Sequence, residues 1–137
     1  MLTYLLDTVV LSEMRKHRAD PRVVDWLSAR AHELLFVSTV TIGEIERGIE
    51  NQRASNAEFA AGLAGWLESL IESCENRILP VDVTIARRWG RLTARLGHAG
   101  SDLLIAATAL EHGLTVATRN IRHFAPAGVA VENPFEG

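Results

Sequence analysis

The stretch Ser101–Asn120, SDLLIAATALEHGLTVATRN, predicts how the rest of the chain folds. Between Leu103 and Leu110 only Thr108 is polar, so this predicted helix has no face suited to water and belongs inside a layered fold. Gly113 lies where a left-handed helix stop is expected. The LTVAT segment that follows has the composition of a short buried strand. The stretch therefore predicts a buried helix that packs on a sheet and leads into one of its strands.

Short apolar segments alternate with helical patterns along the whole chain. We predict strands at Leu2–Leu6, Leu34–Ser38, Ile78–Val81, Leu114–Ala117 and Val129–Glu132. We predict helices at Val10–Lys16, from Pro21 onward behind an Asp20 cap, and at Thr39–Glu50, Ala57–Glu72, Asp82–Leu96 and Asp102–His112, with a polar break at Asn51–Ser55. This alternation favours one domain over residues 1–137, with a three-layer α/β/α fold and a mostly parallel sheet of four or five strands.

One connection leaves two arrangements open. The helix that ends at Leu96 and the helix that starts at Asp102 follow each other with only a short link. If both lay straight along the sheet, the strand Leu114–Ala117 would run antiparallel to the others. A parallel strand requires the helix Asp82–Leu96 to cross obliquely or to pack off the sheet.

Composition limits the class of protein but not its partner. A single cysteine, Cys74, excludes an internal disulfide and suits a reducing compartment. No charged and then apolar leader precedes the first strand, and no apolar run could span a bilayer, so we expect a cytoplasmic protein without a membrane partner. The net charge of −3 does not indicate nucleic-acid binding.

The basic residues are distributed unevenly. Lys16 is the only lysine among 14 basic residues, and arginine is the side chain that best matches phosphate geometry. The arginines cluster at 15–22, 87–95 and 119–122. Each cluster taken alone is also compatible with a solvated helix face.

Polar side chains follow several of the predicted strands at their carboxyl ends. Asp7 ends the first strand, Glu44 lies in the first turns after the second, and Asn120 follows the fourth. If the fourth strand is parallel, the helix that precedes it begins at this same edge, so Asp102 lies there too. In open α/β sheets ligands bind outside this edge.

Each of these residues also has a purely structural interpretation. These are a turn for Asp7 and Asn120, a capping box with Thr41 for Glu44, and a helix cap for Asp102. Capping explains each position separately but not why all of them share one edge.

Carboxylates gathered at one edge indicate a metal site. They repel each other, and a hard divalent cation with oxygen ligands relieves that repulsion. We therefore predict a Mg²⁺ or Mn²⁺ site held by Asp7, Glu44 and Asp102, with Asn120 orienting a water or a phosphate oxygen. Such sites serve phosphodiester hydrolysis. Arg119 is the arginine best placed to hold a phosphate.

Other residues are predicted to support the acids. The hydroxyls of Thr8, Ser38 and Thr118 are expected to donate hydrogen bonds to the carboxylates. His98 and His123 lie near the same predicted edge and are candidates for a supporting role in proton transfer. Glycine-rich nucleotide loops and the HExxH and CxxC metal motifs are absent from the sequence.

The ordered segments YLLDT, VSTVTIGEIERGI, SDLLIAATALEHGLTVATRNIRHF and a closing NPF resemble the PIN-domain nucleases. Within them the chain looks most like the VapC toxins of bacterial toxin–antitoxin pairs and their FitB-like relatives. The likeness covers essentially the whole chain, and it implies a PIN-like fold, related to the RNase H-like and 5′-nuclease-like folds. It implies a Mg²⁺- or Mn²⁺-dependent endoribonuclease with Asp7, Glu44 and Asp102 as its acids and a fourth position at or just after Asn120.

The resemblance also implies partners. These are an RNA substrate, a VapB- or FitA-like antitoxin whose tail fills the active-site groove, and a second copy of the chain in a homodimer or a toxin–antitoxin hetero-oligomer on operator DNA. Three departures from the family pattern bear on activity: Val9 where many relatives have Asn, His123 where many have Asp, and a short segment 97–100 before Asp102.

Two other functions stay open at this point. The first is a catalytically weak PIN-domain partner that assembles with a DNA-binding antitoxin to regulate transcription. The second is a metal-dependent nuclease that acts on DNA.

Overall fold

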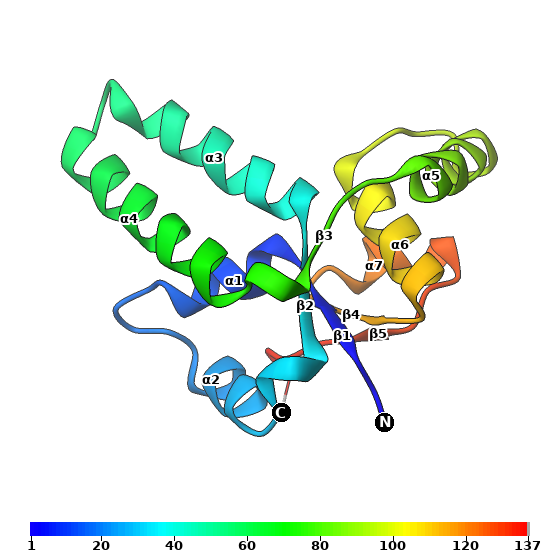
Figure 1. Cartoon of the computed structure of the whole chain (residues 1–137), viewed down its shortest axis with the longest axis horizontal. Coiled ribbons are helices and arrows are strands. Elements are labelled where there is room, and N and C mark those ends of the chain that lie inside the picture. The colour runs from blue at the N-terminus through cyan, green and yellow to red at the C-terminus, as the bar shows by residue number, and fades with distance from the viewer. Residues whose placement is uncertain (137) are drawn as a thin grey trace.

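The computed structural model describes residues 1–136 and contains a five-stranded parallel sheet flanked by helices (Figure 1). The strands are β1 Tyr4–Leu6, β2 Leu35–Ser38, β3 Ile78–Leu79, β4 Thr115–Ala117 and β5 Val131–Glu132. Their order in the sheet is β3-β2-β1-β4-β5, and every neighbouring pair is parallel. The predicted fold class is confirmed.

Helices make up most of the rest. They are α1 Thr8–Met14, α2 Pro21–Ser28, α3 Thr39–Arg53, α4 Ala57–Ser73, α5 Val83–Leu96, α6 Ser101–His112 and α7 Ile121–Phe124, with 3₁₀ turns η1 His32–Leu34, η2 Glu75–Arg77 and η3 Ala125–Ala127. None of the helices within residues 1–136 combines the length and hydropathy needed to cross a membrane.

Several predicted boundaries were wrong by one to three residues. The first strand begins at Tyr4, because Leu2 is 60% exposed and has no strand partner. Helix α1 begins at Thr8, earlier than predicted, because the Asp7 side chain caps it. Helix α3 continues to Arg53, so the predicted polar break at Asn51–Ser55 is shorter. The predicted strands starting at Leu34, Ile78, Leu114 and Val129 are each shorter in the structure.

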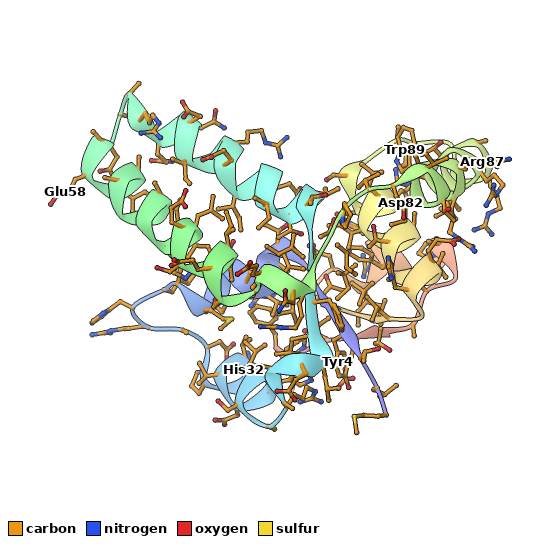
Figure 2. The ribbon with its side chains drawn as sticks, in the orientation of Figure 1. Tyr4, His32, Glu58, Asp82, Arg87 and Trp89 are labelled. Atoms are coloured by element: carbon orange, nitrogen blue, oxygen red, sulfur yellow. The ribbon has the colours of Figure 1, made fainter. Side chains whose placement is uncertain are left out.

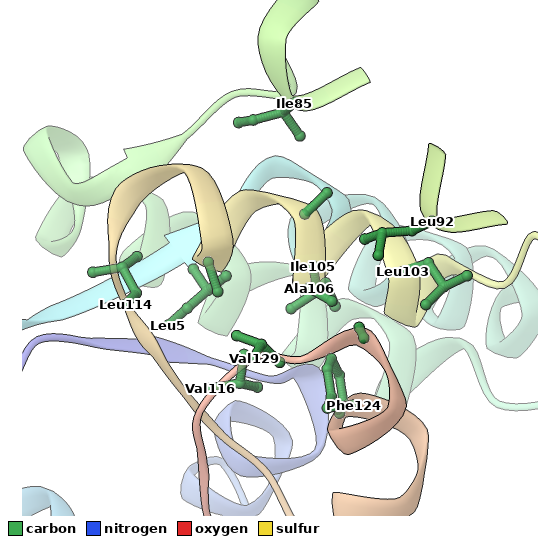
Figure 3. Packing of buried hydrophobic residues seen from close by; sticks show 13 residues of the cluster. Leu5, Ile85, Leu92, Leu103, Ile105, Ala106, Leu114, Val116, Phe124 and Val129 are labelled. Atoms are coloured by element: carbon green, nitrogen blue, oxygen red, sulfur yellow. The ribbon is translucent and has the colours of Figure 1, made fainter. Parts of the chain in front are cut away.

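Helix α6 is the centre of the larger core cluster, as the sequence predicts. Leu103, Ile105 and three of its alanines have no exposed surface. Figure 3 shows Leu5 of β1 and Val116 of β4 meeting the apolar side chains of this helix. Burying each leucine or isoleucine contributes about 1.5–3 kcal/mol, so the helix is held rigidly against the sheet.

The two faces of the sheet alternate along β1. Leu5 belongs to the core cluster of α6, whereas Tyr4 (labelled in Figure 2) and Leu6 belong to the cluster that contains residues of α1 and α2. This alternation follows from the two-residue period of a strand. The sheet is therefore covered on both sides, and its polar groups are confined to the strand ends.

Helix α5 packs against the outside of α6 and not on the sheet (Figure 1). Arg88 of α5 forms an ion pair with Glu111 of α6, which holds the two helices side by side. Gly97 ends α5 with φ of 79°, and Gly113 ends α6 with φ of 66°, the left-handed conformation that glycine adopts without strain. Because α5 packs off the sheet, α6 can lead into a β4 strand that runs parallel to β1. This is one of the two arrangements that the short link between the two helices allowed for a parallel strand.

Helices α3 and α4 form a hairpin that projects away from the sheet (Figure 1). They have a small apolar cluster of their own, made by Ile45, Ile49, Ala60 and Leu67. The base of α3 lies at the carboxyl end of β2, so the hairpin carries Glu44 at the edge where Asp7 lies.

Candidate active site

Asp7 lies at the carboxyl end of β1 with only 4% of its surface exposed. Its Oδ1 accepts a hydrogen bond from the backbone N–H of Thr8 at 2.8 Å, and its Oδ2 accepts one from the Thr118 hydroxyl at 2.8 Å. Asp7 therefore caps α1, which agrees with a structural role, and also holds the end of β4. Its carboxylate is fixed by neighbours from both directions.

Glu44 lies one turn into α3 and is held by two hydroxyls. Thr8 donates to its Oε1 at 2.6 Å, and Ser101 donates to its Oε2 at 2.9 Å. The Thr8 oxygen also lies 3.3 Å from that of Thr41. Because the Thr8 hydroxyl has one proton and the carboxylate is the stronger acceptor, Thr41 is left to donate to Thr8.

The capping interpretation of Glu44 was wrong. The residue that caps α3 is Ser38, whose hydroxyl accepts from the Val40 N–H at 3.0 Å, so Thr41 lies inside the helix. Ser38 was predicted to bond a carboxylate and instead performs this cap. Thr8 and Thr118 do donate to carboxylates, as predicted.

Asp102 is the second residue of α6 and is not its cap. Gly100 occupies the cap position and offers no side chain. The Oδ2 of Asp102 lies 2.8 Å from Nδ1 of His123, which is on α7 and has a side chain 59% exposed. His123 was predicted to lie near the edge, and the structure places it in direct contact with one of the acids.

Two other predicted residues are positioned less directly. Asn120 is exposed, and its backbone N–H donates to Thr118 at 2.9 Å. Its side chain makes no hydrogen bond to the three acids within residues 1–136. The guanidinium of Arg119 lies over the Phe135 ring, 3.8 Å from the centroid, so it stacks on an aromatic side chain in this conformation.

Burial raises the pKa of Asp7 from 3.8 to about 6. The hydrogen bonds from Thr118 and Thr8 act in the opposite direction, and the charges of Asp102 and Glu44 raise the pKa further. The three carboxylates therefore lie close enough to interact, although they come from three separate elements. A positive charge placed among them would relieve both the repulsion and the cost of burial.

The donor chemistry of this set fits a hard divalent cation, because all three side chains offer carboxylate oxygens. Over residues 1–136, no three acidic, histidine or cysteine side chains lie close enough to hold one ion together in the conformations observed. Glu44 and Asp102 are engaged by Ser101 and His123. A shared ion therefore requires the three carboxylates to lie closer together than they do here.

A groove opens beside Glu44 between α1, α3 and α4. Its first part has a volume of about 240 Å³ and is lined by Thr8, Glu44 and Trp66, among others. A second part of about 210 Å³ continues over Phe59, whose ring centroid lies 5.3 Å from the Arg15 guanidinium. A separate, mostly apolar cavity of about 250 Å³ between α2, β2 and α4 is lined by none of the three acids.

Comparison with known proteins identifies the family. The family model for the PIN domain matches residues 4–128. The chain belongs to the PIN-domain family. Among curated relatives, plasmid stability protein StbB of Pseudomonas syringae is 38% identical over 96% of this chain and 98% of its own length. VapC ribonuclease Y4jK of Sinorhizobium fredii is 34% identical over 96% of this chain and 97% of its own.

The toxin FitB of Neisseria gonorrhoeae is 35% identical over 96% of this chain and 97% of its own length. The crystal structure of FitAcB from the same organism superposes with a TM-score of 0.88, covering 98% of this PIN domain and 100% of that chain. A structure of FitAB bound to an IR36 DNA fragment superposes with a TM-score of 0.84 at 34% identity, covering 98% and 97% of the two chains. The likeness to the VapC and FitB toxins therefore extends over the whole PIN domain.

Sequence reasoning missed two features of this PIN domain. Ser101 was considered only as part of a helix start, yet it joins α6 to Glu44, a residue 57 positions earlier. No local pattern indicates such a bond. The groove over Phe59 was also missed, because it depends on how the α3–α4 hairpin lies against α1.

Proposed function

We propose that this PIN domain is the toxin of a toxin–antitoxin pair and acts as a Mg²⁺- or Mn²⁺-dependent endoribonuclease. One observation carries the proposal: the carboxylates of Asp7, Glu44 and Asp102 lie at one edge of the sheet, near enough that two of them raise the pKa of the third. The names of two relatives, VapC ribonuclease Y4jK and toxin FitB, support it.

Asp7, Glu44 and Asp102 would hold the metal ion. When bound, the ion supplies positive charge for the phosphate and lowers the pKa of water at the site. The protein's own hydroxyls orient two of these acids: Thr118 donates to Asp7, and Thr8 and Ser101 donate to Glu44. Asp102 lies in the first turn of α6, where the N-terminal dipole of the helix adds positive potential. In this proposal Asn120 orients a water or a phosphate oxygen.

The same similarity supports a proposal about partners. We propose that the chain pairs with a FitA- or VapB-like antitoxin, that it forms a homodimer, and that the complex binds operator DNA. The support is the FitAB structure with a DNA fragment, which matches this chain over nearly its whole length. Residues 1–137 would act as one domain in that assembly.

The test is cleavage of single-stranded RNA by purified protein in Mg²⁺ or Mn²⁺, with and without EDTA. Chelation should abolish cleavage, as should Asp7→Asn and Asp102→Asn. Asp82→Asn is the matched control, because Asp82 caps α5 outside the site and asparagine caps equally well. Cleavage that survives both chelation and the two site substitutions contradicts the proposal. Parallel reactions with DNA distinguish a ribonuclease from a DNA nuclease.

A further inference from the structure

Helix α5 carries an unbalanced set of positive charges. Its sequence, VTIARRWGRLTARL, contains four arginines and no aspartate or glutamate, in a chain whose net charge is −3. Arg87, Arg91 and Arg95 are four residues apart, so they follow one side of the helix with their Cα atoms about 6 Å apart along its axis. Positive charge is therefore concentrated on helix α5 in a protein whose net charge is negative.

These three arginines are exposed and free of ion pairs. Each is classed as exposed to solvent, and within residues 1–136 no carboxylate lies within salt-bridge distance of any of them. The fourth, Arg88, is neutralised by Glu111 of α6. We call Arg87, Arg91 and Arg95 the α5 stripe. Other cations of the chain, such as Lys16 and Arg22, are paired with Glu13 and Asp20.

The α5 stripe leads toward the candidate active site. The pair Arg88–Glu111 places the middle of α5 beside the C-terminal end of α6. Only residues 97–100 join the end of α5 to the start of α6, so the two helices run antiparallel. Arg95 therefore lies nearest the end of α6 that carries Asp102, and Arg87 lies farthest from it.

Charge has the opposite sign on the other side of the molecule. Helix α4 carries Glu58, Glu68 and Glu72 and no lysine or arginine. Figure 2 shows Glu58 and Arg87 at opposite ends of the molecule. Taken alone, α5 therefore attracts a polyanion and α4 repels one.

We propose that the α5 stripe binds the phosphodiester backbone of the RNA substrate and guides the strand to the carboxylate edge. The inference rests on the proposed ribonuclease function and adds the direction from which RNA reaches the site. Arginine suits this role because its planar guanidinium donates to phosphate oxygens and stays charged. Contacts with phosphates carry no sequence information, so the stripe contributes affinity and not sequence choice.

The test measures RNA binding without cleavage. Single-stranded RNA is titrated into protein carrying Asp7→Asn in EDTA, at several salt concentrations, with and without Arg87→Gln, Arg91→Gln and Arg95→Gln. For single-stranded nucleic acid, log K falls with log[salt], and each phosphate contact adds about 0.7 to the magnitude of that slope. Loss of three contacts in the triple variant should therefore reduce the magnitude of the slope by about 2. Affinity should fall by a similar factor for RNAs of different sequence.

Two controls make the test specific. Arg18→Gln, Arg22→Gln and Arg53→Gln together change the net charge equally but lie outside α5, and they should leave the slope unchanged. Replacing the α5 stripe by three lysines should retain the slope, because counterion release depends on charge. Thermal unfolding and mass in solution confirm that each variant keeps its fold and assembly state.

The following results would overturn the inference. These are an unchanged slope in the α5 variant, an equal loss in both triple variants, or a loss of antitoxin binding without any loss of RNA binding. Because binding is measured without metal or turnover, failure here is distinct from failure of the ribonuclease proposal, which is tested by cleavage.

Discussion

The hydroxyl of Thr118 donates a 2.8 Å hydrogen bond to Oδ2 of Asp7, and both side chains are buried where β1 and β4 end. The two residues are 111 positions apart in sequence. This bond joins adjacent strands and compensates part of the cost of burying a carboxylate. The edge of the sheet is therefore organised before any ligand binds.

Thr118→Val should raise the pKa of Asp7 above about 6, because the Thr118 hydrogen bond lowers it. Valine keeps the shape of threonine and removes the donor, so the free energy of unfolding at pH 8 should fall by about 1–3 kcal/mol. Carboxyl ¹³C NMR titration of metal-free protein measures the pKa. Thr108→Val is the control, since within residues 1–136 that buried hydroxyl bonds only the Leu104 carbonyl. An Asp7 pKa that does not move would contradict this account.

Metal-free protein should lose stability as pH rises from about 4 to about 6. Burial raises the folded pKa of Asp7 above its ordinary value of 3.8, so the unfolded chain releases this proton first. The contribution of Asp7 is complete below pH 4 and lost above about 6, and a shift of about two pKa units corresponds to about 3 kcal/mol.

Asp7→Asn removes this pH dependence and should stabilise the metal-free protein at pH 8, by at most about 3 kcal/mol. Urea unfolding in EDTA across this pH range compares the variant with the natural protein. The difference between the two unfolding free energies should grow between pH 4 and 6. A constant difference would show that Asp7 is not titrating there.

Two glycine substitutions should act in opposite directions. A Cβ at either Gly113 or Gly65 meets nothing within 4 Å. The effect of each substitution on stability therefore depends only on the backbone conformation. Gly113 has φ of 66°, and Gly113→Ala should destabilise the protein by about 1–2 kcal/mol. Gly65 lies inside α4, and Gly65→Ala should stabilise it by up to about 1 kcal/mol. Equal effects in thermal or urea unfolding would contradict the assigned end of α6.

Ser101→Ala should weaken the site while leaving the fold intact. The substitution removes the donor to Glu44 Oε2, which frees one side of that carboxylate. Losing such a supporting bond typically lowers metal affinity or activity by about 10- to 100-fold. Ser69→Ala is a matched control, because the Ser69 hydroxyl bonds only the Gly65 carbonyl within α4. Equal metal affinity and RNA cleavage rates in the two variants would show that Ser101 has no such role.

The sequence predicted the buried helix, its glycine stop and the edge shared by the three acids, because each depends on a local pattern or on sheet topology. Leu103–Leu110 could be recognised as buried from its composition alone. The off-sheet position of α5 was one of the arrangements that chain connectivity left open, and the structure decided between them. A single sequence contains the hydrophobic periodicity, the residues that end helices and the order of the strands, and these are physical constraints on the fold.

The sequence could not decide which of two neighbouring residues caps a helix. Thr41 and Glu44 fit a capping box in the sequence, but Ser38 is the residue that caps α3. Which residue caps the helix depends on where β2 ends. Asp102 fits a helix cap in the sequence, but Gly100 occupies the cap position of α6. The carboxylate of Asp102 instead contacts His123. Both errors arose because two residues competed for one role and the tertiary structure decided between them.

The most direct test of the account is Mn²⁺ binding to metal-free protein, followed by electron paramagnetic resonance. Asp7→Asn, Glu44→Gln and Asp102→Asn should each weaken binding, whereas Asp82→Asn should bind Mn²⁺ as the natural protein does. That result would mean that three acids from three elements act as one metal site. Binding that is absent from the natural protein at millimolar Mn²⁺, or unchanged in all three site variants, would contradict it.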